Sequence, residues 1–354
     1  MGRLHHPGGA ASRGGDGHPG RLGADSRGAP GPRDTAAALA PARRDPHLAA
    51  MQRFRIGIDL GGTKTEIAVL GTAGEVLLRR REPTPKTYEG VIERIGAMVE
   101  AAERELGAAP GEASVGIGIP GSLSPATGLV RNANTVALNG KPLAEDLTAR
   151  LGRPLRFSND ANCMAMSEAA DGAGAGYGTV FAVILGTGVG GGIVVNGRLL
   201  DGPNRVAGEW GHTPLPWMTP EEFPGRRCWC GRLGCIETFV SGPALAAEAY
   251  GPGARDATGV PARAAAGDER AIAALERHAD RLARALAGIV NILDPDVIVL
   301  AGGLSNMPHL YERLPALMAP HVFGDVARTP VLRARHGDSS GVFGAARLWD
   351  AANA

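Results

Sequence analysis

Three cysteines, Cys228, Cys230 and Cys235, fall within eight positions of the chain. This spacing suits thiolate ligation of a metal ion better than disulfides, and it indicates a reducing, cytoplasmic setting. Gly231 and Gly234 lie in the same segment and allow the short turn that would let the three thiolates converge. The alternatives to a metal site are unrelated free cysteines or a local disulfide. The fourth cysteine, Cys163, is expected to be a small buried residue of a helix.

A glycine-rich turn in IGIDLGGTKTEIAVL could hold a phosphate group. Gly61 and Gly62 stand between two apolar strands, where backbone N–H groups can approach phosphate oxygens without a Cβ in the way. Asp59 would face the metal-bound end of the phosphates, Thr63 offers a hydroxyl and an N–H, and Lys64 offers a charge. A hairpin turn that needs glycine for steric reasons alone would look the same.

A second turn of this kind, Gly186-Thr187-Gly188 in ILGTGVGGGI, repeats the pattern in the other half of the chain. Two facing turns could clamp a triphosphate from both sides. The chain has no G-x-x-x-x-G-K-[ST] sequence, so neither turn is a Walker loop. The segment VIVLAGGLSN adds another buried strand that ends in a glycine turn, at Gly302 and Gly303, and ligands of open α/β sheets bind at such strand ends.

Asp160, in the sequence NDAN, is the candidate general base. A hydroxyl is a poor nucleophile, and its attack on a phosphoryl group requires a carboxylate within hydrogen-bonding reach. Asp160 lies at a predicted strand-to-helix junction, where its side chain would project from the end of the sheet. An unperturbed aspartate has a pKa of about 3.9, so the sequence calls for no special tuning. The alternative role is a helix N-cap.

The elements that would carry these residues alternate between strands and helices, which predicts an α/β protein. We expect a first lobe over residues 51–176 and a second lobe over residues 177–354, because TVFAVILGTGVGGGIVVNG repeats the opening pattern of strand, glycine turn and strand. Residues 1–50 contain no Lys, no Glu and no apolar periodicity; they are expected to be disordered or non-native, with Met51 as the initiator.

The bulk composition excludes several classes of protein. Of the 354 residues 44% are hydrophobic, which is enough for a large core. Lys and Arg total 37 against 36 for Asp and Glu, so no basic excess would hold a nucleic acid or an anionic membrane. The apolar runs are much shorter than the roughly 20 residues of a membrane helix. The expected partners are small molecules or a second copy of the chain, as a homodimer.

In order along the chain, the motifs DLGGTKT, NDAN, LGTGVGGG, GEWGH and CWCGRLGCIE resemble those of the ROK family of bacterial sugar kinases and repressors. The resemblance extends from about Arg55 to Trp349. It implies the two-lobed, ribonuclease-H-like α/β fold of the hexokinase–actin ATPase superfamily, with a cleft between the lobes. Stretches such as GIPGSLSPATGLVRNAN and AGEWGHTPLPWM are similar to the fructokinase (mannokinase) branch.

The resemblance also implies roles for individual residues. Gly302 and Gly303 would lie against the adenosine of ATP. His212 would be the fourth ligand of a closed, structural zinc site with the three clustered cysteines. The sugar would be bound by a larger set: Gly121, Asn134, Asn159, Glu209, His212 and Glu237.

The predicted activity is ATP-dependent phosphorylation of a hexose at its 6-hydroxyl, with Mg²⁺ and with D-fructose as the expected sugar. Glucose, mannose or N-acetylglucosamine are the alternatives within the family. A sugar-responsive repressor is a further alternative, but residues 1–50 have no 3.6-residue apolar period from which to build a helix-turn-helix. A zinc-stabilised sugar-binding protein without turnover is the last alternative.

Overall fold

The computed structural model describes residues 53–133, 135–337 and 340–350, which lie within one compact unit, Asp45–Ala354. The extension predicted over residues 1–50 lies outside the described residues. In the part of the chain that the structure describes, no helix is long and apolar enough to cross a lipid bilayer.

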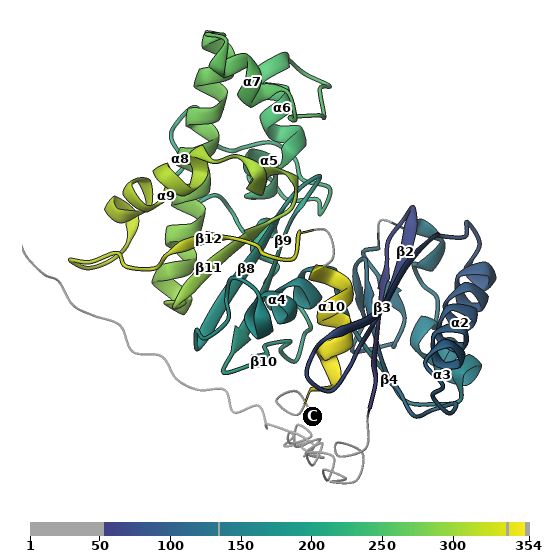
Figure 1. The fold of residues 1–354 in the computed structure, drawn as a ribbon. Coiled ribbons are helices and arrows are strands. Elements are labelled where there is room, and N and C mark those ends of the chain that lie inside the picture. Colours follow the sequence, from purple (N-terminus) through teal and green to yellow (C-terminus); the bar gives the residue numbers. More distant parts are fainter. Residues whose placement is uncertain (1–52, 134, 338–339, 351–354) are drawn as a thin grey trace, which may run out of the picture. The chain divides into compact units, whose positions relative to one another are not determined.

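The first sheet has the strand order β3-β2-β1-β4-β7 (Figure 1). β1, β2 and β3 form an antiparallel meander, whereas β1, β4 and β7 run parallel. The strands are β1 (Arg55–Leu60), β2 (Lys64–Leu70), β3 (Val76–Pro83), β4 (Ser114–Ile119) and β7 (Leu155–Asn159). The parallel strands are connected through α2 (Tyr88–Glu105), the short pair β5 (Ser122–Leu123) and β6 (Val130–Arg131), and α3 (Leu143–Leu151).

Alternation along β1 and β4 gives the first sheet two different faces. Ile56 and Ile58 belong to a buried core with apolar residues of α2 and α3. Gly57 and Gly116 are paired across β1 and β4 and leave space on the other face. A Cβ on Gly57 would lie 2.0 Å from the carbonyl oxygen of Val342, so glycine lets the last helix, α10 (Ser340–Ala346), approach the sheet closely.

The second sheet, β10-β9-β8-β11-β12, repeats the arrangement of the first, with a hairpin beside parallel strands. Its strands are β8 (Thr179–Leu185), β9 (Val189–Val195), β10 (Arg198–Leu199), β11 (Val297–Ala301) and β12 (Val331–Arg333). Phe181 and Val183 pack in a core with the long helix α8 (Glu269–Leu293), while Val180 and Ala182 pack with α4 (Asp160–Asp171). Both faces of β8 are therefore buried, as expected for a parallel strand between helical layers.

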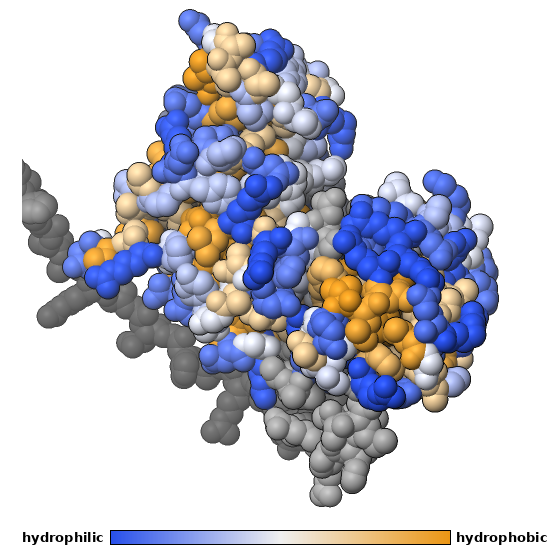
Figure 2. All heavy atoms as spheres, in the orientation of Figure 1, coloured by the Kyte–Doolittle hydropathy of each residue, from blue (hydrophilic) through white to orange (hydrophobic). Residues whose placement is uncertain are grey.

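The remaining helices extend the α8 side: α5 (Glu237–Val240), α6 (Gly242–Tyr250), α7 (Val260–Ala265) and α9 (His309–Met318). Two helices connect the sheets, because α4 contacts β8 and β9 as well as β7, and α10 contacts α4 as well as β1 and β4. The boundary that we placed at residue 176 stays a prediction. The face seen in Figure 2 carries both hydrophilic and hydrophobic side chains.

Candidate active site

The carboxyl ends of three parallel strands bring the first group of candidate residues together. Asp59 near the end of β1 pairs with Gly118 in β4, and Ile119 pairs with Asn159 at the end of β7. Asn159 Nδ2 donates a hydrogen bond to the carbonyl oxygen of Gly121, at 3.2 Å, in the segment that follows β4. The candidates from the first half of the chain thus share one edge of the sheet. Asn134 lies outside the described residues.

Asp160 is the first residue of α4, and the N-cap of this helix is Asn159. The backbone N–H of Ala161 donates to Asn159 Oδ1 at 2.8 Å and to Asp160 Oδ1 at 2.8 Å. Because Asn159 caps the helix, capping does not account for Asp160. The side chain of Asp160 is open to solvent at the end of the sheet, where a substrate could reach it.

The environment raises the pKa of Asp160 above its ordinary range, so the expectation of an unperturbed carboxylate is wrong. Protein packed around the group desolvates the carboxylate even though solvent reaches it, and the charge of Glu209 adds to the shift. The hydrogen bond from the Ala161 N–H acts in the opposite direction and lowers the pKa of Asp160. Burial, followed by the charges of Asp160 and Glu66, raises the pKa of Asp59 to about 7. Repulsion between clustered carboxylates of this kind is relieved by a bound cation, and oxygen donors suit Mg²⁺.

The first glycine turn connects β1 to β2 directly beside Asp59. Gly61 N–H donates to the carbonyl oxygen of Lys64 at 3.0 Å, which closes the turn. Thr84, the residue after β3, holds this turn, because its hydroxyl donates to the Gly61 carbonyl at 2.8 Å and its N–H donates to the Thr63 carbonyl at 3.1 Å. Gly62, Thr63 and Lys64 remain exposed. A fixed, exposed turn beside a carboxylate is suited to a metal-bound phosphate.

The second glycine turn connects β8 to β9 and lies beside the turn that follows β11. Gly186 N–H donates to the Gly188 carbonyl at 3.0 Å, on either side of Thr187, and Gly242 N–H donates to the Gly186 carbonyl at 2.8 Å. Gly302, with φ of 83°, precedes Gly303, and a Cβ on Gly302 would lie 2.4 Å from the Leu185 carbonyl oxygen. The five predicted nucleotide-binding residues of the second half therefore lie at one sheet edge.

Helix α4 brings this second edge close to Asp160. A Cβ on Gly190, in β9, would lie 3.3 Å from the Cβ of Ala161, the residue after Asp160. The predicted base is therefore next to the strand that follows the second glycine turn.

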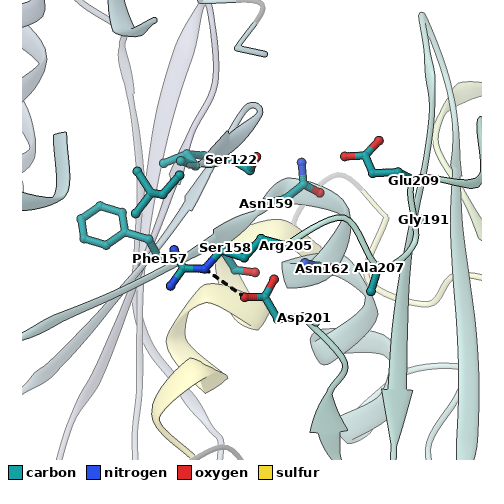
Figure 3. A pocket seen from close by; sticks show the side chains of 12 residues that line it. Ser122, Phe157, Ser158, Asn159, Asn162, Gly191, Asp201, Arg205, Ala207 and Glu209 are labelled. Atoms are coloured by element: carbon teal, nitrogen blue, oxygen red, sulfur yellow. Dashed lines mark ion pairs between the residues drawn. The ribbon is translucent and has the colours of Figure 1, made fainter. Parts of the chain in front are cut away.

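A small pocket, open to solvent, lies between the ends of the first sheet, α4 and β9 (Figure 3). Two predicted residues, Asn159 and Glu209, line it, and Asp160 adjoins it through Asn159. The other lining residues are Ile119, Ser122, Leu123, Phe157, Ser158, Asn162, Gly191, Asp201, Arg205 and Ala207. Asp201 and Arg205 form an ion pair at 3.5 Å, drawn dashed in Figure 3. Sequence reasoning missed this pair, since the loop between β10 and Glu209 has neither periodicity nor a motif.

Four predicted metal ligands converge in the segment before α5. The ligand atoms of His212, Cys228, Cys230 and Cys235 all lie within 4.8 Å of one another. His212 Nδ1 is 3.5 Å from Cys228 Sγ, and Cys230 Sγ is 3.6 Å from Cys235 Sγ. Three thiols and one imidazole nitrogen at these separations fit tetrahedral Zn²⁺. Since Nδ1 faces the thiols, the other ring nitrogen of His212 is available for a different partner.

Glu237, the first residue of α5, is predicted to bind sugar, and both of its carboxylate oxygens contact the protein. Oε1 accepts a hydrogen bond from the indole N–H of Trp229 at 2.8 Å, and Oε2 accepts one from the backbone N–H of Val189 at 2.9 Å. The carboxylate thus connects the cysteine segment to the strand after the second glycine turn. No pattern in the sequence indicates this connection.

Comparison with known proteins identifies the family. The model of the ROK family matches residues 55–352. An N-acetyl-D-glucosamine kinase of Escherichia coli O6:H1 is 43% identical over 304 residues, which cover 82% of this chain and 98% of that kinase. The chain belongs to the ROK family. An N-acetyl-D-glucosamine kinase of Salmonella newport is similar to this ROK protein with the same identity and coverage.

Solved structures of the ROK family agree with this assignment. A ROK hexokinase from Thermus thermophilus is 33% identical with a TM-score of 0.73, and the match covers 83% of this chain and 96% of that one. A ROK family glucokinase from Streptomyces griseus, in complex with glucose and AMPPNP, is 30% identical with a TM-score of 0.66, over 83% of this chain and 98% of that one.

Three of the predictions can now be judged. The two-lobed hexokinase/actin-like α/β fold is confirmed. The prediction of a ROK family sugar kinase that acts on a hexose is confirmed as well, and ATP with Mg²⁺ fits that class. The finer prediction of a fructokinase is not supported, because the relatives at 43% identity are N-acetyl-D-glucosamine kinases.

Proposed function

We propose that this ROK family kinase transfers the γ-phosphoryl group of MgATP to the 6-hydroxyl of N-acetyl-D-glucosamine. The observation that carries the proposal is the 43% identity with the Escherichia coli N-acetyl-D-glucosamine kinase over 98% of that enzyme. The family match, over residues 55–352, spans both sheets. Fructose, the sugar expected from sequence motifs, becomes the comparison substrate.

In the proposed reaction Asp160 accepts the proton of the 6-hydroxyl as its oxygen attacks the γ-phosphorus. The new oxygen–phosphorus bond forms while the bond from the γ-phosphorus to the bridging oxygen breaks, and ADP leaves with that electron pair. The raised pKa of Asp160 supports this role, because a more basic carboxylate accepts a proton more readily. Asn159 fixes the start of α4 and thereby the position of the base.

The nucleotide would lie between the two glycine turns. We assign the β- and γ-phosphates to the two turns, Gly61–Lys64 and Gly186–Gly188, and the adenosine to Gly302 and Gly303. Asp59 would face the metal-bound phosphates. Bound Mg²⁺ would neutralise phosphate charge during the transfer. The exposure of the first turn and the raised pKa of Asp59 both support this placement.

The hexose would lie against Asn159, Glu209, the free ring nitrogen of His212, and Glu237. Carboxylate and amide groups of this kind recognise hydroxyls, and an unmatched hydroxyl leaves them unpaired at a cost in binding. The Asp201–Arg205 pair in the pocket wall is a further candidate contact.

His212, Cys228, Cys230 and Cys235 would hold one Zn²⁺. Four protein ligands leave no open position for water, so the metal would stabilise the fold rather than act on the substrate. It would fix the wall of the sugar site, because Glu209 and His212 precede the cysteine segment and Glu237 follows it. A cytoplasmic location and a homodimer stay predictions.

The test is a coupled assay of ADP release with MgATP and N-acetylglucosamine, N-acetylmannosamine, glucose, mannose or fructose. We expect the highest kcat/KM with N-acetylglucosamine. A higher kcat/KM with fructose would restore the fructokinase hypothesis. Sugar binding without ADP release would indicate a binding protein instead of a kinase.

A further inference from the structure

Trp229 is a large exposed side chain within the cysteine segment. It lies between two candidate metal ligands, Cys228 and Cys230, and 65% of its surface is exposed. Its indole N–H donates to Glu237 Oε1 at 2.8 Å, and its ring packs edge-on against the His212 ring, with 4.9 Å between centroids. Both partners are residues that we assign to the sugar. Two specific contacts therefore orient an indole that is otherwise exposed.

The second oxygen of Glu237 is held by the strand that follows the second glycine turn. Val189 N–H donates to Glu237 Oε2 at 2.9 Å, and a Cβ on Gly188 would lie 2.8 Å from the same oxygen. One carboxylate therefore joins Trp229 on one side to the proposed phosphate turn on the other. Its orientation depends on donors from both sides.

We propose that Trp229 is a positioning residue that holds Glu237 for the hexose and couples the sugar site to the ATP site through Glu237 and Val189. A carboxylate oxygen can accept more than one hydrogen bond, so a sugar hydroxyl can share Oε1 with the indole N–H. Without the indole N–H the carboxylate gains rotational freedom, which sugar binding would then have to remove. This inference rests on the proposed function.

The matched pair of variants is Trp229→Phe and Trp217→Phe. Phenylalanine at 229 keeps an aromatic ring but removes the N–H donor. Trp217 is a suitable control because 51% of its surface is exposed and its ring packs on His321 in another part of the chain. Zinc content and thermal midpoint are measured for both variants, so that loss of the metal would be recognised.

For Trp229→Phe we expect KM for the hexose to rise about five- to tenfold, the effect of losing one hydrogen bond to a charged group near solvent. KM for ATP should rise by a smaller factor. The reason is that Glu237, which also holds Val189 beside the Gly186–Gly188 turn, becomes less well ordered. Once both substrates are saturating, kcat should stay within about twofold, since the base is untouched. Trp217→Phe should have the same KM for the hexose, KM for ATP and kcat as the wild type.

Fluorescence gives a second measurement, made in the Trp217→Phe protein and therefore independent of how Trp229→Phe folds. Three tryptophans remain: Trp229 is exposed, Trp210 is only 3% exposed, and Trp349 is half-buried with its indole N–H bonded to the Val115 carbonyl. Iodide should therefore quench chiefly Trp229, and a saturating hexose should protect it. Unchanged quenching on addition of the hexose would overturn the proposal.

The kinetic outcomes separate the two proposals. If the wild type releases no ADP with any hexose, the proposed function fails whatever Trp229 does. If the wild type is active and Trp229→Phe has the KM values of Trp217→Phe, the function stands and Trp229 has no positioning role. A lower KM for the hexose in Trp229→Phe would mean that the indole competes with the sugar, which also contradicts the inference.

Discussion

Replacing Asp59 by asparagine should stabilise the ligand-free protein and at the same time abolish phosphoryl transfer. Asp59 is partly buried at the end of β1, and desolvation followed by the charges of Asp160 and Glu66 raises its pKa from 3.8 to about 7. Lys64 and Arg81 offset only part of this effect. Ionisation of Asp59 therefore costs free energy in the folded protein but not in the unfolded chain, so it lowers the stability of the fold.

The magnitude follows from the shift in pKa. A rise from 3.8 to about 7 is roughly three units, or about 4 kcal/mol at 1.36 kcal/mol per unit. Because an acid with a raised pKa is destabilising only when ionised, the cost is absent below about pH 4, grows between pH 4 and 7, and is constant above. It is about 2 kcal/mol at pH 5 and about 4 kcal/mol at pH 8, both upper values since solvent reaches part of the side chain.

The assay is urea denaturation of the wild type and of Asp59→Asn, without nucleotide or added Mg²⁺, at pH 5 and pH 8. We expect the variant to have a higher free energy of unfolding than the wild type at both pH values. The difference should be roughly twice as large at pH 8 as at pH 5. Asp325→Asn replaces an exposed aspartate and should show no such pH dependence. An Asp59→Asn protein that is no more stable than the wild type, or equally more stable at both pH values, would refute the electrostatic reasoning. ADP release by Asp59→Asn should be lost, because the amide carries no charge for the metal-bound phosphates.

Two further predictions concern the second half of the chain. Burial opposes ionisation of Glu222, but hydrogen bonds from Arg284 and Arg281 lower its pKa from 4.5 to about 2, so Glu222→Gln should cost about 3 kcal/mol at pH 7. This stabilisation is present above pH 4.5 and lost as the pH falls toward 2, so denaturation curves of the two proteins should converge in acid; a constant difference would contradict the assignment. Cys228→Ala should reduce bound zinc from about one per chain to a small fraction and lower the thermal midpoint, measured by metal analysis and calorimetry. A variant with full zinc content and an unchanged midpoint would remove Cys228 from the site.

Local signals in the sequence predicted the elements that carry the site. The bounds of α8 follow from such signals, because Asp268 caps its start and Asp294-Pro295 stops it. The junction at Asn159-Asp160 is observed as the end of β7 and the start of α4. Glycine turns between apolar strands predicted both hairpins. Each of these features depends on residues that are close together in the chain.

Contacts between distant segments could not be predicted in the same way. No pattern near Glu237 indicates that its carboxylate joins Trp229 to Val189, because these contacts depend on how the cysteine segment packs against β9. Desolvation of the Asp160 carboxylate, with a smaller contribution from the charge of Glu209, likewise raises the pKa of Asp160, and the sequence did not indicate this packing. The preferred hexose depends on such spatial relations, and short sequence motifs such as those behind the fructose prediction do not contain them.

The measurement that tests the account most directly compares turnover and sugar binding in Asp160→Asn. Asparagine has nearly the same size as aspartate but cannot accept the hydroxyl proton, so we expect kcat to fall by about 10²- to 10⁴-fold while Kd for N-acetylglucosamine changes only a few-fold. Calorimetry gives Kd and the coupled assay gives kcat on the same preparation. Turnover within about tenfold of the wild type, with the sugar still bound, would contradict the role of Asp160 as the base.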